Sequence, residues 1–416
     1  MDKKQLRKLR DERVRQGLPG QWYPVCKSVE VRMDRPYGGK LLDKKIVLWR
    51  SEDGSINCIE DYCPHRGAPL SLGEIHDGHI GCRYHGIVMN GEGGIVQVPA
   101  MPECALEGRK TNDAYQVHEV ADAVFVYMPS AAQPDPIPFE TPEELISDEW
   151  TGFLCTAIWQ ANYRLALDNL ADPMHGCYLH ASSFTLAFGA KQDLVELDDR
   201  DGSFLVSRVG QTGENFDWVE MVVGDGASYC RLDIPYPAAA GPGGNMRIIG
   251  YVAPLDENTC KVFFWRLRKV SGLERSAWRF LYRANLEPRH WHVLEQDRII
   301  LEEMTDDAGR RGKDQVAVHG RMRRHKRAGV AVMCCRCETG ALRLGECGVC
   351  RDNADGCIGV CSKLGRRHVR LWELCWQAVT AELLGHFERR SPEVLACADC
   401  CRAERIHGDE CSDGMA

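Results

Sequence analysis

The chain has 416 residues, of which 44% are hydrophobic, and its formal net charge is −8. A chain of this length predicts two or three domains, each with a hydrophobic core. The negative charge balance argues against binding to nucleic acid or to an anionic membrane through bulk charge.

The first 20 residues are charged and contain no apolar segment of the kind found in signal peptides. No later stretch approaches the roughly 18 uncharged apolar residues that a membrane-spanning helix needs. We therefore expect a solvated N-terminal helix over residues 1–20, no signal peptide, no membrane span and a cytoplasmic location.

Residues 21–128 have the pattern of an all-β domain. Apolar runs at residues 46–49 and 56–59 lie on either side of an Asp-Gly pair that ends at Gly54, which is a hairpin signal. The apolar run at residues 124–127 predicts the strand that closes this domain.

Residues 129–149 are rich in proline and predict an extended linker between domains. From residue 150 to about 310 the pattern is mixed α and β. Residues 246–266 predict a β-hairpin, and residues 281–304 predict a helix.

Two short segments each combine one cysteine with one histidine: residues 63–65 read CPH and residues 82–85 read CRYH. A Rieske [2Fe–2S] cluster needs two thiolates on one iron and two imidazoles on the other. The alternative is a zinc site, but zinc fingers usually pair Cys with Cys and His with His along the chain. The pattern therefore predicts a Rieske cluster held by Cys63, His65, Cys82 and His85.

A second candidate metal centre lies in residues 168–180, which read DNLADPMHGCYLH. His175 and His180 are five residues apart, which on a regular helix places them about 140° apart. A local irregularity such as a π-bulge would bring them to one face. A mononuclear Fe(II) site needs two histidines and one carboxylate. Two unrelated histidines are the alternative, but an upstream cluster that delivers electrons favours an iron acceptor here.

The third ligand of such a site must come from elsewhere in the chain. In the expected helix 281–304, Asp297 falls on an apolar stripe formed by Val293, Ile300, Leu301 and Met304. A buried carboxylate costs several kcal/mol unless it is paired or binds a metal. Asp297 is therefore the candidate carboxylate ligand, with a buried ion pair as the alternative.

Residues 21–304 resemble the α subunits of Rieske non-haem iron aromatic-ring oxygenases. The resemblance rests on the CPH and CRYH segments, on the N-x-x-D-x-x-H-x-x-x-x-H spacing from Asn169 to His180, and on the acidic helix around Asp297. Within the family, the chain is most similar to the phenoxybenzoate, chlorobenzoate and phthalate dioxygenase group, with phenoxybenzoate dioxygenase as the nearest.

The resemblance implies an α+β fold, with an N-terminal all-β Rieske [2Fe–2S] domain and a C-terminal helix-grip catalytic domain that holds one mononuclear Fe(II). It also implies a head-to-tail homo-oligomeric ring, usually a trimer. In that ring Asp172 would bridge the cluster of one subunit to His175 of the next, and Asn169 would support the iron or bind it weakly. A helix N-cap is the alternative role for Asp172.

We therefore expect a terminal oxygenase that dihydroxylates an aromatic carboxylate with O2 and with electrons from NAD(P)H. A separate reductase or ferredoxin would deliver the electrons, because no nicotinamide-binding G-x-G-x-x-G follows a strand. Arg231, Arg247 and Arg266 are candidates for pairing with the substrate carboxylate. The alternatives are a monooxygenase or O-demethylase of an aromatic acid and, in another class, a Rieske electron carrier without oxygenase activity.

The composition changes in residues 311–416, a tail rich in Arg and Cys. Twelve of the 21 cysteines lie between Cys334 and Cys411. Two C-x2-C pairs, at residues 334–337 and 347–350, have the spacing of a small zinc site. The interpretation that we favour is that the tail is disordered or results from a shifted reading frame.

Overall fold

The computed structural model describes residues 15–173, 175–183, 186, 195–208, 216–223, 226–236 and 241–304, together with the backbone of residues 367–369. The expectations for residues 1–14 and for nearly all of the tail, including its two C-x2-C pairs, lie outside these residues. No helix in the described part of the chain is long and apolar enough to span a bilayer.

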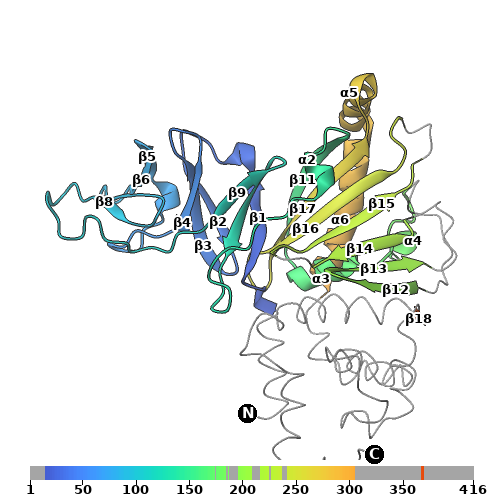
Figure 1. The fold of residues 1–416 in the computed structure, drawn as a ribbon, viewed down its shortest axis with the longest axis horizontal. Coiled ribbons are helices and arrows are strands. Elements are labelled where there is room, and N and C mark those ends of the chain that lie inside the picture. Colours follow the sequence, from blue (N-terminus) through green and yellow to red (C-terminus); the bar gives the residue numbers. More distant parts are fainter. Residues whose placement is uncertain are drawn as a thin grey trace, which may run out of the picture.

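The N-terminal part consists of three small antiparallel sheets, drawn in blue to teal in Figure 1. Their strand orders are β1-β10-β9, β2-β3-β4 and β5-β6-β7-β8. The strands are β1 (Gln21–Lys27), β2 (Tyr37–Leu41), β3 (Lys44–Arg50), β4 (Ile56–Glu60), β5 (Glu74–His76), β6 (His79–Gly81), β7 (Val88–Met89), β8 (Ile95–Gln97), β9 (Val117–Val120) and β10 (Ala123–Met128). Two 3-10 turns, η1 (Ser28–Glu30) and η2 (Leu70–Leu72), lie between them.

Two sequence predictions for this part are confirmed. Strands β3 and β4 form the expected hairpin, with Gly54 in the turn at a φ of 85° that favours glycine. Strand β10 closes the domain by pairing antiparallel with the first strand, β1. All six residues of β10 are buried, because other elements cover both of its faces.

The C-terminal part is built on an eight-stranded antiparallel sheet with the order β11-β17-β16-β15-β14-β13-β12-β18. Its strands are β11 (Trp150–Trp159), β12 (Val195–Arg200), β13 (Ser203–Arg208), β14 (Trp218–Val222), β15 (Tyr229–Ile234), β16 (Met246–Pro254), β17 (Cys260–Lys269) and β18 (Arg367–Val369). The expected hairpin at residues 246–266 is confirmed as β16 and β17.

The faces of β17 belong to two different cores. Phe263, Trp265 and Leu267 pack with aromatic and aliphatic residues of β1 and β10. Val262 and Phe264 pack on the opposite face, in the core of the C-terminal part. Nine of the ten residues of β17 are buried as a result, although antiparallel strands more often bury only one face.

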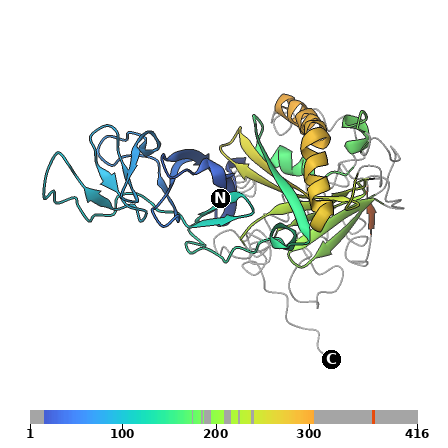
Figure 2. The same cartoon turned by 90° about the horizontal axis from the view of Figure 1, so that it is seen from above.

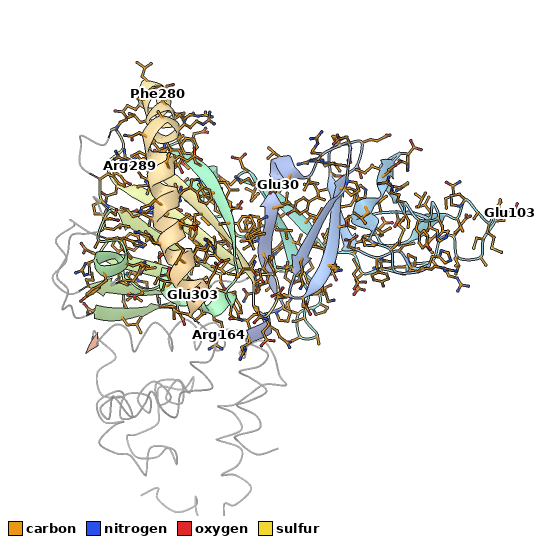
Figure 3. All side chains as sticks on the ribbon, turned by 180° about the vertical axis from the view of Figure 1, so that it is seen from behind. Glu30, Glu103, Arg164, Phe280, Arg289 and Glu303 are labelled. Atoms are coloured by element: carbon orange, nitrogen blue, oxygen red, sulfur yellow. The ribbon has the colours of Figure 1, made fainter. Side chains whose placement is uncertain are left out.

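Helices cover the face of the sheet that looks away from the N-terminal part (Figures 1 and 2). They are α3 (Tyr163–Leu170), α4 (Gly176–Leu179), α5 (Gly272–Leu281) and α6 (Glu287–Glu303), with a π-helical segment η4 (Tyr282–Leu286) joining the last two. A short helix, α2 (Glu143–Ile146), precedes β11. In Figure 3, α5, η4 and α6 form one continuous rod from Phe280 past Arg289 to Glu303.

Candidate metal centres and substrate cavity

The two Cys-His segments form two loops of the same design. Each loop contains a glycine at positive φ four residues after its cysteine, Gly67 at 72° and Gly86 at 76°. The glycine N–H donates to the cysteine carbonyl at 2.8 Å in both loops. A residue with a side chain adopts such a φ only at a cost, so glycine fixes each turn and with it the direction of the Cys side chain.

The four candidate cluster ligands meet at the tips of these loops. Cys63 and Cys82 are 2% and 3% exposed, whereas His65 and His85 are exposed, with ring centroids 4.6 Å apart. Burial raises the pKa of the Cys63 thiol, and the neighbouring Cys82 thiol raises it further. Two buried thiols beside two exposed imidazoles fit a Rieske cluster, in which the Cys-bound iron is inside and the His-bound iron faces the surface.

The two histidines of the second centre flank the four-residue helix α4. His175 is its N-cap and His180 is its C-cap, where φ is −101° and ψ is 31°. The irregularity that brings them together is therefore the end of a short helix rather than a π-bulge within a longer one. Their ring centroids lie 5.1 Å apart.

Helix α6 brings Asp297 to both histidines. The Nε2 atom of His180 lies 3.2 Å from Oδ1 of Asp297, and Nε2 of His175 lies 3.6 Å from the same atom. One ligand atom of each residue lies within 4.8 Å of the others, close enough for all three to hold one metal ion. Asp297 and His180 are 5% and 1% exposed, so this set is largely shielded from bulk water.

The second ring nitrogen of each histidine is held by a hydrogen bond. Nδ1 of His180 lies 3.0 Å from Oε1 of Gln296, and Nδ1 of His175 lies 2.5 Å from the main-chain oxygen of Asp172. Both bonds leave Nε2 directed at Asp297, which is the usual arrangement of metal-binding histidines. This bond of His175 is to the main chain of Asp172, and the expected contact of the Asp172 carboxylate stays a prediction.

Asn169 contributes to the same site from the last turn of α3. Its Nδ2 donates to Oδ1 of Asp297 at 3.3 Å. Burial lowers the pKa of His180, but the hydrogen bond and charge of Asp297 and the bond to Gln296 outweigh it, so that the pKa is raised overall. The carboxylate of Asp297 therefore favours the protonated form of the His180 imidazole.

The apolar stripe expected on the last helix is only partly buried. Leu301 is 3% exposed and Val293 is partly buried, but Ile300 and Met304 are each 46% exposed. The expected stripe was too wide. The buried residues of α6 are His290, Asp297 and Leu301, which follow one another at intervals of seven and four positions and so lie on one narrow face. Asp297 itself lies on that buried face.

The donors of the second set fit a mononuclear Fe(II) ion. Two imidazole nitrogens and one carboxylate on one side of a metal leave coordination positions open toward the other side. None of the three residues pairs with a lysine or arginine, so the buried-ion-pair alternative for Asp297 finds no support among the described residues. Their assignment as iron ligands stays a prediction.

A cavity of about 740 Å³ opens beside this set of residues. Its walls are largely apolar and come mainly from the sheet and from α6, with Leu170 of α3 and Phe216 before β14. The residues of the sheet and of α6 include Leu232, Ile234, Met246, Ile248, Phe264 and Leu294. The volume is in the range of small-molecule sites. A planar apolar molecule held by these walls would lie against His175, His180 and Asp297.

The three candidate arginines differ in where they lie. Arg231 and Arg247 do not line the cavity; each pairs with Glu144 and with one further acid. Arg266 lines the cavity and is 2% exposed. Sequence reasoning had no means of separating the three, because all lie on strands of the same sheet.

Three cavity or support residues were not identified from the sequence: Gln296, Tyr236 and His290. His290 lies two helical turns before Asp297, on the same face of α6, and its Nε2 is 2.7 Å from the hydroxyl of Tyr236. The seven-residue spacing of His290 and Asp297 was the signal that could have indicated a shared polar face.

Two family models match the chain in succession. Residues 21–119 match the Rieske [2Fe-2S] domain, and residues 159–323 match the vanillate O-demethylase oxygenase C-terminal domain. The second match runs past residue 310, where we expected the catalytic domain to end. With the fold and the two sets of metal-binding residues described above, these matches show that the chain belongs to the Rieske non-haem iron oxygenase α subunit family.

Two relatives of known name match parts of the chain. The vanillate O-demethylase oxygenase subunit of Pseudomonas sp. (strain HR199 / DSM 7063) is 38% identical over 165 residues, 39% of this chain and 45% of the relative. The putative toluene-4-sulfonate monooxygenase system iron-sulfur subunit of Comamonas testosteroni is 34% identical over 182 residues, 43% of this chain and 51% of the relative. The matched regions thus span about half the length of these curated relatives.

The fold is similar to that of a solved oxygenase. The carbazole-bound oxygenase of carbazole 1,9a-dioxygenase, in complex with ferredoxin, matches with a TM-score of 0.60 and 24% identity, over 76% of this chain and 90% of the other. This likeness supports the two-part α+β architecture. The cofactor set, a [2Fe–2S] cluster and a mononuclear iron, is supported by the two family matches. Phenoxybenzoate dioxygenase, the nearest relative expected from sequence, is not among these three proteins.

Proposed function

We propose that the chain is the terminal oxygenase of a multicomponent Rieske system that acts on an aromatic acid. The observation that carries this proposal is the presence of two sets of candidate metal-binding residues in one chain, the second of them beside an apolar cavity of about 740 Å³. When bound, the cluster on Cys63, His65, Cys82 and His85 would supply single electrons, and the iron on His175, His180 and Asp297 would activate O2.

The residues of the second centre have separate tasks. His175, His180 and Asp297 would hold the metal, while Asn169 and Gln296 would fix the orientation of two of these ligands through hydrogen bonds to Asp297 and His180. The apolar walls of the cavity would orient the arene and exclude water from the open side of the metal.

The two centres lie far apart within one chain. In Figure 1, the sheet of β5 to β8 that carries the cluster loops lies at one end of the molecule, and α4 lies near the other. Electron transfer between them is more easily understood between neighbouring subunits of a ring, which supports the trimer-type assembly suggested by the resemblance. In this assembly Asp172 would lie between the cluster of one subunit and the iron of the next.

A separate protein would supply the electrons. The solved carbazole 1,9a-dioxygenase oxygenase is in complex with a ferredoxin. Exposed His65 and His85 on this chain would offer an exit and entry point for electrons at the surface. We propose a ferredoxin or an NAD(P)H-dependent reductase as the partner; the cytoplasmic location also stays a prediction.

Monooxygenation with O-demethylation is the outcome that we favour over dihydroxylation. The C-terminal match is to a domain named for vanillate O-demethylase, and the second relative is named as a sulfonate monooxygenase. The dihydroxylation expected from the sequence remains the second candidate. An electron carrier without oxygenase chemistry is less well supported, because it would have no use for the cavity or for the set around Asp297.

Product analysis by mass spectrometry under 18O2 tests the proposal. The purified chain would be combined with a surrogate reductase and a panel of methoxylated and unsubstituted aromatic acids. O-demethylation releases formaldehyde and leaves a phenol, dihydroxylation adds both labelled oxygens to the ring, and the absence of any oxidised product with every acid would contradict the proposed function.

A further inference from the structure

We propose, on the basis of the proposed function, that Arg266 is the binding site for an anionic group on the aromatic substrate, a carboxylate or a sulfonate. The position of Arg266 in the cavity, its lack of a counter-ion and its free hydrogen-bonding edge each point to this role.

Arg266 is a buried cation that no acid neutralises among the described residues. Its Nη1 donates to the hydroxyl of Tyr282 at 2.8 Å and to Sγ of Cys155 at 3.2 Å, and its guanidinium lies 5.7 Å from the ring centroid of Trp291. All three partners are uncharged groups in these contacts. Burying a charge without a partner is unfavourable, and a bound anion would offset that cost.

The unused edge of the Arg266 guanidinium has the geometry that anions need. Both hydrogen bonds of Arg266 use Nη1, so Nε and Nη2 make none with a described residue. Nε–H and Nη2–H point in parallel and form the fork that binds two oxygens of one carboxylate. Tyr282 and Cys155 would hold the guanidinium in place while this fork faces the ligand.

Arg231 and Arg247 provide an internal contrast. Arg231 pairs with Glu144 at 3.0 Å and Glu220 at 2.9 Å. Arg247 pairs with Glu144 and Asp233. Arg231 and Arg247 are thus matched with acids of the same chain, whereas Arg266 pairs with no acid among the described residues.

The described lining of the cavity contains more cations than acids. Arg266 and Arg289 line it, while Asp297 is the one acid among the described lining residues and is directed at the two histidines. Burial, together with weaker repulsion from Arg266, Arg268 and Arg289, lowers the pKa of His290 to about 3. His290 is therefore neutral and provides no negative charge to pair with Arg266 or Arg289.

Arg266 lies beside Trp291, about one and a half helical turns before Asp297 on α6. Tyr282, which holds Arg266, packs against His290 with ring centroids 5.5 Å apart. His290 and Asp297 are seven residues apart on α6, about 10 Å along the helix axis. An arene bound by its anionic group at Arg266 would present the opposite end of its ring to the metal, so oxidation is expected away from that group.

The first test measures binding to the purified full-length chain by isothermal titration calorimetry. The probes are 4-methoxybenzoate, 4-methoxybenzenesulfonate and the uncharged 4-methoxybenzamide. A charge-assisted pair predicts that at least one anion binds about tenfold or more tightly than the amide. The tighter of the two anions identifies the group that the site prefers, and equal affinity for all three probes would overturn the proposal.

The second test uses three variants with the same probes. Arg266→Gln should lose the preference for the anion, and Arg266→Lys should retain only part of it, because an ammonium keeps the charge but not the fork. Arg279→Gln is the matched control, since Arg279 is an exposed arginine of α5 that does not line the cavity. Unchanged anion affinity in Arg266→Gln would contradict the proposal.

The binding tests can fail for Arg266 without contradicting the proposed oxygenase activity, and the reverse also holds. Binding is measured without a reductase or O2, so an anion preference that depends on Arg266 stands even if no product forms. If Arg266→Gln does not fold, as judged by its thermal unfolding, the wild-type comparison and Arg266→Lys still decide. Oxidised product without any anion preference would support the function and refute the role of Arg266.

Discussion

The Nδ1 atom of His180 lies 3.0 Å from Oε1 of Gln296, the residue directly before Asp297 on α6. One helix thus provides both a candidate metal ligand and the group that orients another. The geometry of the site therefore depends on the position of α6 relative to α4.

We predict that Gln296→Ala weakens Fe(II) binding about 10- to 100-fold, because His180 loses the partner that fixes its ring and its tautomer. Titration of the chain with Fe(II) under anaerobic conditions measures this. Glu295→Gln is the control, since Glu295 is exposed and pairs with Arg298 on the outer face of the same helix. Equal iron affinity in Gln296→Ala and the control would remove Gln296 from the site.

We predict that His65→Cys retains cluster iron but lowers the reduction potential of the cluster, because an anionic thiolate replaces a neutral imidazole. Protein-film voltammetry gives the potential, and EPR of the reduced protein shows whether the Rieske signal is lost. Zinc in place of iron in anaerobically purified wild-type protein would contradict the cluster assignment.

We predict that Asp172→Asn retains both metals and the signal of the reduced cluster but loses nearly all turnover, because in the proposed ring the carboxylate would lie on the route between subunits. The main-chain bond from Asp172 to Nδ1 of His175 does not involve the carboxylate and survives this change. Single-turnover kinetics with a pre-reduced cluster measure the transfer. Loss of the mononuclear iron in Asp172→Asn would instead show that the side chain supports metal binding.

We predict that His290 makes the chain less stable in mild acid. Its pKa is about 3 in the folded chain, against an ordinary value of 6.5, so below pH 6.5 only the unfolded chain takes up the proton. The free energy of unfolding should fall by about 1.4 kcal/mol per pH unit from this residue alone. Urea unfolding measures this free energy at about pH 7 and about pH 5. Between these two pH values it should fall by about 2 kcal/mol less in His290→Gln than in the wild type.

The parts of this structure that follow from local chemistry could be predicted from the sequence. The hairpin at Gly54 and the hairpin of β16 and β17 have turn residues between apolar runs, and the structure contains both. The four cluster residues could be named because each loop carries its ligands within a few positions. Asp297 could be named because an acid on an apolar helix face needs a partner.

The parts that depend on tertiary contacts could not be predicted in this way. The exposure of Ile300 and Met304 depends on what packs against α6, which periodicity does not show. The main-chain contact from Asp172 to His175 depends on the backbone path between α3 and α4. Arg266 differs from Arg231 and Arg247 only in its neighbours across the sheet, and these are fixed by the register of strands.

The most direct test of the account is the metal content of Asp297→Ala, with Glu295→Gln as the control. Removing one of three ligands leaves two imidazoles, too few to hold Fe(II) firmly. We predict that Asp297→Ala keeps the Rieske EPR signal and the cluster iron but loses the mononuclear iron and all oxidation of substrate. Glu295→Gln should keep the EPR signal, both kinds of iron and the turnover. Mononuclear iron and turnover at the wild-type level in Asp297→Ala would contradict the account.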